Sequence, residues 1–171
     1  MLYIILSAVL HEIAHIYAMK KCGLDIKEIA LKPFGINIKI KDGKYIAYKK
    51  EILIALAGPI ANLLAAIIVF LFNIFIYRFE AGVFIVVVNL LLAFLNLLPI
   101  DRLDGGEILK NLLLMKFEPY TVDKICYVTS IIFLTPILFF GGILLYKTGY
   151  NFSLLIIGFY LLISIAIKSK D

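Results

Sequence analysis

The two histidines of this chain lie four residues apart, in the segment His11-Glu12-Ile13-Ala14-His15. Residues i and i+4 of a helix share one face, so both imidazoles can bind one metal ion, and the adjacent glutamate can act as a general base. Chance would place two histidines four apart in a chain of this length only about once in a hundred times. The alternative is a polar helix end that faces a loop. The spacing favours a metal site in which His11 and His15 are ligands and Glu12 is the catalytic base.

A catalytic zinc ion takes three protein ligands and keeps one position open. The chain has no third histidine, so the remaining ligand must be a carboxylate or a cysteine. Asp101 and Asp104 follow a later apolar segment, whereas Cys22 lies seven residues after His15, at the wrong end of its helix. The two aspartates are therefore the better candidates.

Asp104 precedes two glycines, which allow the backbone to come close to a neighbouring element. Asp104 and Glu107 also match a capping box at the start of a short helix. Considered alone, the capping role is favoured. The need for a third ligand reverses that preference, and we expect Asp104 to bind the metal.

Long apolar segments must position these residues. Hydrophobic residues make up 63% of the 171 residues, charged residues only 17%, and the mean hydropathy is +1.03. This composition excludes a soluble enzyme, a nucleic-acid-binding domain and a disordered chain. Each apolar segment is about as long as a membrane crossing requires. The five segments are 2–19, 52–77, 81–98, 126–145 and 152–167. We predict an all-α membrane protein with about five transmembrane helices, forming a single domain over residues 1–171.

The basic residues alternate between the loops. Nine lysines lie between the first and second apolar segments, and 15 of the 17 basic residues fall on one side of the predicted membrane. The positive-inside rule makes that side cytoplasmic. We therefore expect the N-terminus outside, the C-terminus inside, and both histidines near the cytoplasmic face.

Two shorter elements are expected at the membrane surface. Isoleucines alternate with polar residues over 36–41, Asp42-Gly43 suits a two-residue turn, and residues 45–48 follow. This pattern predicts a small β-hairpin over residues 34–48. Apolar residues at helical spacing predict a short interfacial helix over residues 105–117.

The motifs resemble those of a known family. Asn96, Pro99, Asp104 and Gly105 match position by position the second motif of the site-2 proteases, which are intramembrane zinc metalloproteases. The segment 11–15, inside an apolar stretch, is similar to their first motif. The resemblance covers residues 1 to about 115, and the remainder matches only as apolar segments.

Two further segments, 32–35 and 57–59, are similar to the branch that contains the stage IV sporulation protein FB proteases. That branch usually has an extra span before the metal helix and a soluble C-terminal domain. Neither is present in this sequence, so we do not expect ligand-gated control through such a domain. The branch also tends to have a second proline where Arg102 stands, which predicts a different rigidity for this loop.

The resemblance implies one zinc ion per chain, held by His11, His15 and Asp104, with Glu12 as the base that activates water. It implies a membrane-spanning or membrane-tethered protein as substrate, with a transcription factor or sporulation sigma factor precursor as one such substrate. It also implies a lipid bilayer and a membrane-protein inhibitor as partners, and no nucleic acid. The expected location is the cell membrane of a prokaryote, with the active site near the cytoplasmic face.

Several alternatives stay open. Asn62 and Asn96 are polar residues in or near apolar segments, and we interpret both as candidate substrate-binding residues, with packing hydrogen bonds as the alternative. The hairpin either pairs with an unwound substrate strand or is a passive surface ribbon. The whole protein is alternatively a catalytically silent relative that binds membrane proteins, or a metal transporter. Intact Glu12 argues against the first, and the few polar residues in the other apolar segments argue against the second.

Overall fold

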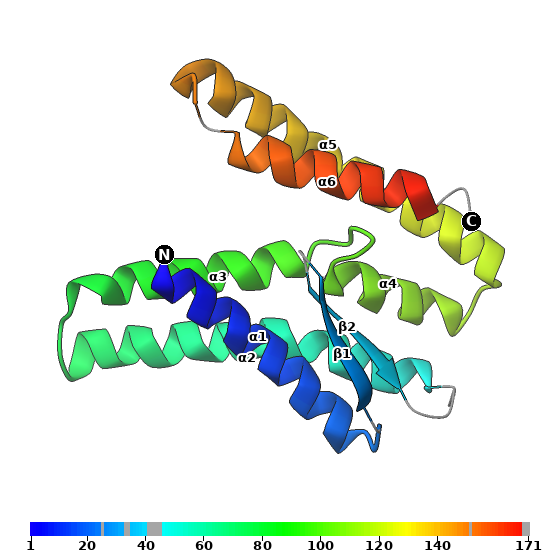
Figure 1. Cartoon of the computed structure of the whole chain (residues 1–171), viewed down its shortest axis with the longest axis horizontal. Helices are drawn as coiled ribbons and strands as arrows, with labels where there is room; N and C mark the ends of the chain where they lie inside the picture. The colour runs from blue at the N-terminus through cyan, green and yellow to red at the C-terminus, as the bar shows by residue number, and fades with distance from the viewer. Residues whose placement is uncertain (25, 33–34, 41–45, 151, 169–171) are drawn as a thin grey trace. The chain divides into compact units, whose positions relative to one another are not determined.

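The computed structural model describes residues 1–24, 26–32, 35–40, 46–150 and 152–168. The described residues form six helices and two strands (Figure 1). The chain divides into two compact units, Met1–Leu97 and Leu98–Asp171. The mostly helical structure agrees with the predicted all-α class, and the single-domain organisation stays a prediction.

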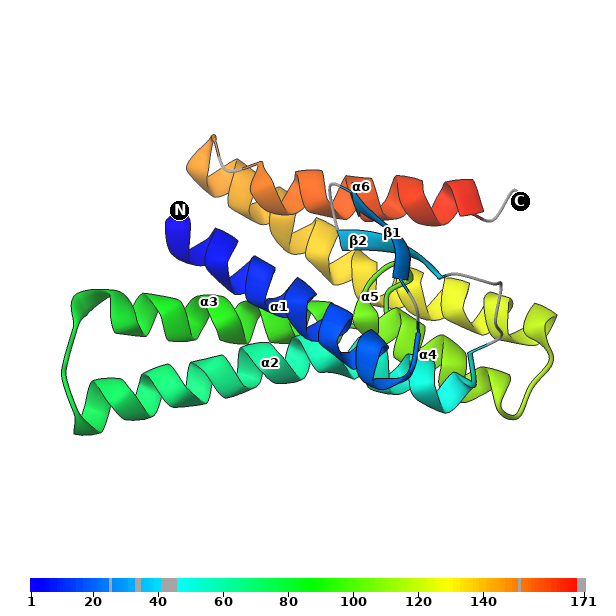
Figure 2. The same ribbon diagram turned by 60° about the horizontal axis from the view of Figure 1, so that its bottom comes forward.

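Three helices and a small sheet form the first unit. The helices are α1 (Leu2–Lys21), α2 (Tyr48–Phe75) and α3 (Glu80–Asn96). Helices α2 and α3 form an antiparallel pair, and α1 packs against both (Figures 1 and 2). The buried positions of these helices are mostly small or polar, which allows the backbones to approach closely, as in membrane helix bundles. They include Ser7, His11, Gly58, Asn62, Ala66, Asn89 and Ala93.

Large apolar side chains lie mainly on the outside of the first unit. Ile5, Phe75 and Phe94 are 52%, 77% and 64% exposed. In water this distribution would be costly, because each exposed side chain forgoes about 1.5–3 kcal/mol of burial energy. Lipid tails are as apolar as these side chains, so a membrane removes the cost. The polar-inside, apolar-outside arrangement is therefore that of a membrane protein.

The described residues do not reach the predicted number of about five spanning helices. Among the described residues, three helices are long and apolar enough to cross a membrane: α1, α2 and α5 (Pro119–Thr148). Helix α3 has 17 residues and rises about 26 Å, which is shorter than a hydrocarbon core of about 30 Å. It ends at Asn96 because Pro99 follows and cannot supply a helical N–H. The last helix, α6 (Ser153–Lys168), is also apolar and short.

The predicted hairpin over 34–48 is also wrong in its partner strand. Strand β2 (Gly35–Ile40) coincides with the predicted isoleucine alternation, but it pairs antiparallel with the preceding β1 (Ile26–Lys32). The register runs from Ile26 opposite Ile40 to Lys32 opposite Gly35. Residues 45–48 offered too short a strand, and Tyr48 begins α2 instead. The predicted turn at Asp42-Gly43 lies outside the described residues.

The second unit contains α4 (Asp104–Leu114), α5 and α6. Helix α4 confirms the helix predicted after Pro99. Helices α5 and α6 form an antiparallel hairpin (Figure 2). Their buried apolar cluster also includes a residue of the loop before α4. Its members are Ile100, Leu134, Leu161 and Ile165.

Lys110 and Asp123 form an ion pair of 3.4 Å that joins α4 to α5. Burial alone would lower the pKa of Lys110, but Asp123, together with Glu107 and Asp101, outweighs burial and raises it. The pair is partly exposed, so its contribution to stability is small, about 0–1 kcal/mol. The ion pair therefore adds little to the stability with which α4 packs on α5.

Candidate metal centre

One buried face of α1 carries all of its buried residues. Ser7, His11 and His15 follow each other at intervals of four, and they are 5%, 5% and 9% exposed. The interval of four places them one above another along the helix. The rings of His11 and His15 have centroids 4.8 Å apart and an interplanar angle of 78°. The sequence prediction of a shared face is thus met by the geometry.

His15 is oriented by the backbone of α2. Its Nδ1 donates to the carbonyl oxygen of Ile54 at 2.8 Å. A carbonyl oxygen only accepts, so the hydrogen must be on Nδ1, and Nε2 keeps its lone pair. The next carbonyl, that of Ala55, faces Pro59, which has no N–H to offer it. The helical ladder is therefore incomplete at the turn that receives His15.

His11 is oriented by a side chain of α2, that of Asn62. Its Nδ1 lies 3.0 Å from Oδ1 of Asn62, and both residues are buried. The bond leaves Nε2 of His11 as the remaining ring nitrogen. In each histidine Nδ1 makes a protein contact and Nε2 is the nitrogen that would bind a metal, which is the usual arrangement of metal-binding histidines.

Gly58 provides the space that the two Nε2 atoms face. A Cβ built on Gly58 would lie 2.6 Å from Nε2 of His11 and closer still to Nε2 of His15. Any side chain at position 58 would thus occupy the volume at the tips of both ligands. Two neutral imidazoles converging on a small cradle fit a zinc ion in both chemistry and space.

Asp104 is the first residue of α4, and it is partly buried. The N-cap of α4 is Leu103, and the cap makes no side-chain hydrogen bond. The observed N-cap is thus Leu103 and not Asp104, the residue that the capping box would place there. The carboxylate of Asp104 remains the candidate for metal binding.

The loop before Asp104 is tightly held within its unit. The N–H of Asp101 donates to Oγ of Ser130 at 2.8 Å, and this hydroxyl donates to the carbonyl of Cys126 at 2.7 Å. A Cβ on Gly106 would lie 2.7 Å from the carbonyl carbon of Ile100, so only glycine allows this approach. These contacts fix the position at which α4 begins.

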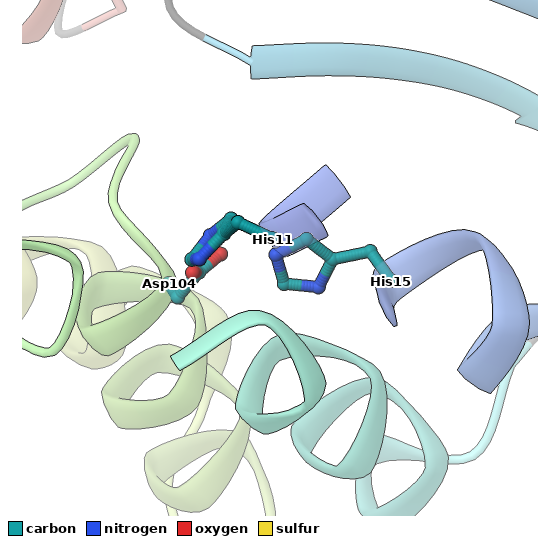
Figure 3. Close-up of side chains that lie close together, drawn as sticks. All are labelled: His11, His15 and Asp104. Atoms are coloured by element: carbon teal, nitrogen blue, oxygen red, sulfur yellow. The ribbon is translucent and has the colours of Figure 1, made fainter. Parts of the chain in front are cut away.

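His11, His15 and Asp104 are the group of three His, Cys, Asp or Glu residues that is suited to a metal ion in the described part of the chain (Figure 3). One ligand atom of each lies within 4.8 Å of the others. Asp101 and Cys22, the other candidates for third ligand, do not belong to this group.

The remaining predicted residues, Glu12, Asn62 and Asn96, lie on α1, α2 and α3. Glu12 follows His11 on α1 and is partly buried. Asn96 donates to the carbonyl of Leu92 in its own helix at 2.9 Å, which is a local contact. Asn62 is fully buried and bonded to His11.

Sequence reasoning missed several residues that support the centre. It noted Gly58 only as part of the segment 57–59, and it did not single out Ser7, Asn89 or Ser130. The available signal was the presence of polar residues within apolar segments, which is costly unless each has a partner. For Ser7, the interval of four to His11 was a further signal.

The chain is similar to known proteins of one peptidase family. Residues 1–82 and 79–137 match the model of peptidase family M50. A zinc metalloprotease of Methanocaldococcus jannaschii is 33% identical over 123 residues, which are 70% of this chain and 35% of that protein. Stage IV sporulation protein FB of Bacillus subtilis is 29% identical over 113 residues, or 64% of this chain and 38% of that protein.

A solved structure extends the similarity to nearly the whole chain. The site-2 protease from Methanocaldococcus jannaschii aligns with a TM-score of 0.73 and 26% identity, covering 98% of this chain and 76% of that one. The two curated relatives are matched over little more than a third of their own length. The family match covers most of the chain, from the histidine motif past Asp104. The chain therefore belongs to peptidase family M50, the family of the site-2 proteases.

Proposed function

We propose that this chain is an intramembrane zinc metalloprotease that hydrolyses a peptide bond of a membrane-embedded or membrane-tethered protein. The observation that carries the proposal is the orientation of the two histidines. In both residues Nδ1 makes a hydrogen bond to α2, and both Nε2 atoms face the cradle at Gly58. Glu12, the candidate base, is adjacent to His11 in the same motif.

The proposed ligands are His11, His15 and Asp104, for one zinc ion per chain. Two imidazoles and one carboxylate are a known catalytic zinc ligand set, which leaves a position open for the reaction. The support is the spacing of the ligand atoms, all within 4.8 Å of one another. When bound, zinc supplies Lewis acidity that makes water a nucleophile near neutral pH and polarises the scissile carbonyl.

Glu12 then performs the proton transfers. Its carboxylate accepts a proton from the attacking water and delivers that proton to the nitrogen of the leaving amine. The peptide C–N bond breaks, and the products are a new carboxylate and a free amine. His15 and His11 keep their orientation throughout because Ile54 and Asn62 hold the opposite ring nitrogens.

The proposed substrate class follows from the surroundings of the motif. Helix α1 exposes apolar side chains such as Leu6 and Ile13, as expected for lipid contact. A transmembrane segment hides its backbone in its own hydrogen bonds, so it must unwind before it is cleaved. One similar protein is named stage IV sporulation protein FB, which supports a role in sporulation. We propose a membrane-tethered transcription factor precursor as substrate and a membrane protein as inhibitor.

We also propose that the active site lies near the cytoplasmic face of a prokaryotic cell membrane. The support is the set of nine lysines between residues 20 and 50, the first two of which are the last residues of α1. Basic loops stay on the cytoplasmic side. His15 lies six residues before the end of α1, on the side of these lysines.

Replacement of Glu12 tests the chemistry. Glu12→Gln should retain zinc and lose cleavage of a membrane-tethered test substrate by about 10²–10⁴-fold, because general base catalysis contributes that much. Metal analysis and a cleavage assay measure the two effects separately. Glu80→Gln, at the start of α3, is the matched control and should cleave normally. Cleavage by Glu12→Gln at the wild-type rate would refute the assignment, and a wild-type protein that binds zinc without cleaving would favour a silent relative or a transporter.

Replacement of Asp104 tests the ligand set. Asp104→Ala should lower the zinc content of the purified protein, since one of three ligands is lost. Asp123→Ala, which removes an exposed carboxylate paired with Lys110, should leave the zinc content unchanged. Full zinc content in Asp104→Ala would remove Asp104 from the set.

A further inference from the structure

A continuous chain of buried polar side chains connects the three helices of the first unit. Its members come from all three helices and are each at most 5% exposed. They are Ser7 and His11 of α1, Asn62 of α2 and Asn89 of α3. Buried amides are costly in apolar surroundings unless every polar atom is paired. The bonds they make therefore indicate what the chain of side chains does.

The bonds have one possible direction, and a backbone carbonyl sets it. Nδ2 of Asn89 lies 2.9 Å from the carbonyl oxygen of Ile85, which only accepts, so the amide nitrogen must be on that side. The second hydrogen of this nitrogen is donated to Oγ of Ser7, also at 2.9 Å. Oδ1 of Asn89 consequently faces Asn62 and accepts from its Nδ2 at 3.1 Å.

The same reasoning continues to the histidine. Nδ2 of Asn62 also faces the carbonyl of Ser7 at 3.5 Å, which again requires a donor on that side. Oδ1 of Asn62 is therefore left to face Nδ1 of His11, 3.0 Å away, and this ring nitrogen must donate. All hydrogens and the acceptor of the Asn62 amide are then used.

We propose that Asn62 is a positioning residue that fixes His11 in the tautomer with hydrogen on Nδ1, so that the lone pair of Nε2 is directed at the metal. Asn62 would thus act through His11 and not by binding substrate. The inference deepens the proposed zinc function and rests on it. Outer partners of this kind typically change metal affinity by 10–100-fold when they are removed.

The tautomer can be measured without metal. The chain contains only two histidines, so nitrogen-15 spectra of the metal-free full-length protein in detergent give two sets of ring signals. At a pH where both rings are neutral, both should show hydrogen on Nδ1, and His11→Gln assigns the signals. Asn62→Leu should leave the His15 pattern intact and convert His11 to a mixture of tautomers. A wild-type His11 with hydrogen on Nε2, or no change in Asn62→Leu, would overturn the inference.

Two further variants control for folding. Asn62→Asp keeps an acceptor oxygen and should keep hydrogen on Nδ1 of His11. Asn111→Leu removes another buried asparagine, whose Nδ2 bonds Glu107 and not a histidine, and should leave both ring patterns unchanged. A His11 pattern that changes equally in Asn111→Leu would show a general loss of structure and contradict a specific role for Asn62.

Zinc titration separates this inference from the proposed function. Asn62→Leu should bind zinc about 10–100-fold more weakly than wild type, and Asn62→Asp within about tenfold of wild type. If wild type binds zinc and Asn62→Leu binds it equally well, the positioning role is wrong. If wild type binds no zinc at all, the proposed function fails, whereas the tautomer measurement still decides how Asn62 acts on His11.

Discussion

Gly58 leaves open the space beside Nε2 of both histidines, the position proposed for the metal ion. Gly58→Ala should make α2 intrinsically more favourable by about 1 kcal/mol, because alanine is the better helix former. The added methyl group would nevertheless occupy the volume in front of both Nε2 atoms. We predict a folded protein with zinc affinity lowered by at least about 10-fold, comparable to loss of an outer-shell partner. Isothermal titration with zinc measures this change.

Gly142→Ala is the matched control for this substitution. Gly142 also lies inside a helix, and a Cβ built there meets nothing within 4 Å. The control should bind zinc as wild type does. Wild-type zinc affinity in Gly58→Ala would mean that the cradle is not the metal position.

The sequence was informative at this scale where the physics is local. The spacing of His11 and His15 was enough to place both on one helix face, because the helical repeat fixes that geometry. The contact between His11 and Asn62 joins residues 51 positions apart, and no local rule pairs them. Substrate binding by Asn62 and Asn96 stays a prediction for Asn96, and for Asn62 we now favour positioning.

At the scale of elements, the start of α4 depends on Ser130. Ser130→Ala would leave the buried N–H of Asp101 without its acceptor, which costs about 1–3 kcal/mol. We predict a lower free energy of unfolding, measured by denaturant titration in detergent, and weaker zinc binding because Asp104 follows this loop. The change should exceed that of any exposed hydroxyl on the same helix.

Thr135→Ala provides that comparison within α5. Thr135 is exposed, and its hydroxyl bonds only the carbonyl of Ile131 one turn earlier, at 2.7 Å. Its replacement should change the unfolding free energy by no more than about 0.5 kcal/mol. Equal effects of Ser130→Ala and Thr135→Ala on the unfolding free energy would show that the contact with Asp101 contributes no extra stability.

The elements were predictable in type more than in pairing. Long apolar segments and the stop at Pro99 identified the helices, including α4. The isoleucine alternation identified β2, but its partner depended on which neighbouring segment was free to extend. Helix α2 begins at Tyr48 and removes the downstream candidate. Strand addition to this sheet by a substrate stays a prediction.

For the whole molecule, zinc binding and stability should be linked. A ligand that binds only the folded protein stabilises it by about 4 kcal/mol when present at a thousand times its dissociation constant. We predict that a chelator lowers the thermal unfolding temperature of the wild-type protein. Without chelator, His15→Gln should unfold at a lower temperature than the wild-type protein. Addition of the chelator should not lower that temperature further. If the chelator does not change the unfolding temperature of the wild-type protein, bound zinc does not stabilise the fold.

Span number was the least predictable whole-molecule property. Hydropathy marks α3 and α6 as apolar, but it does not reveal where a helix ends. The N-terminus-outside orientation was built on five crossings and stays a prediction. The cytoplasmic placement of the basic loop after α1 does not depend on that count, because it requires only that α1 crosses the membrane.

Arg102, two residues before Asp104, has a backbone φ of 80°. Proline is confined to a φ of about −65°, so the branch in which a proline occupies this position must route its loop differently. A chimaera that imports that proline alone would therefore misdirect the aspartate, whereas exchange of the entire stretch 98–104 would carry its own geometry with it.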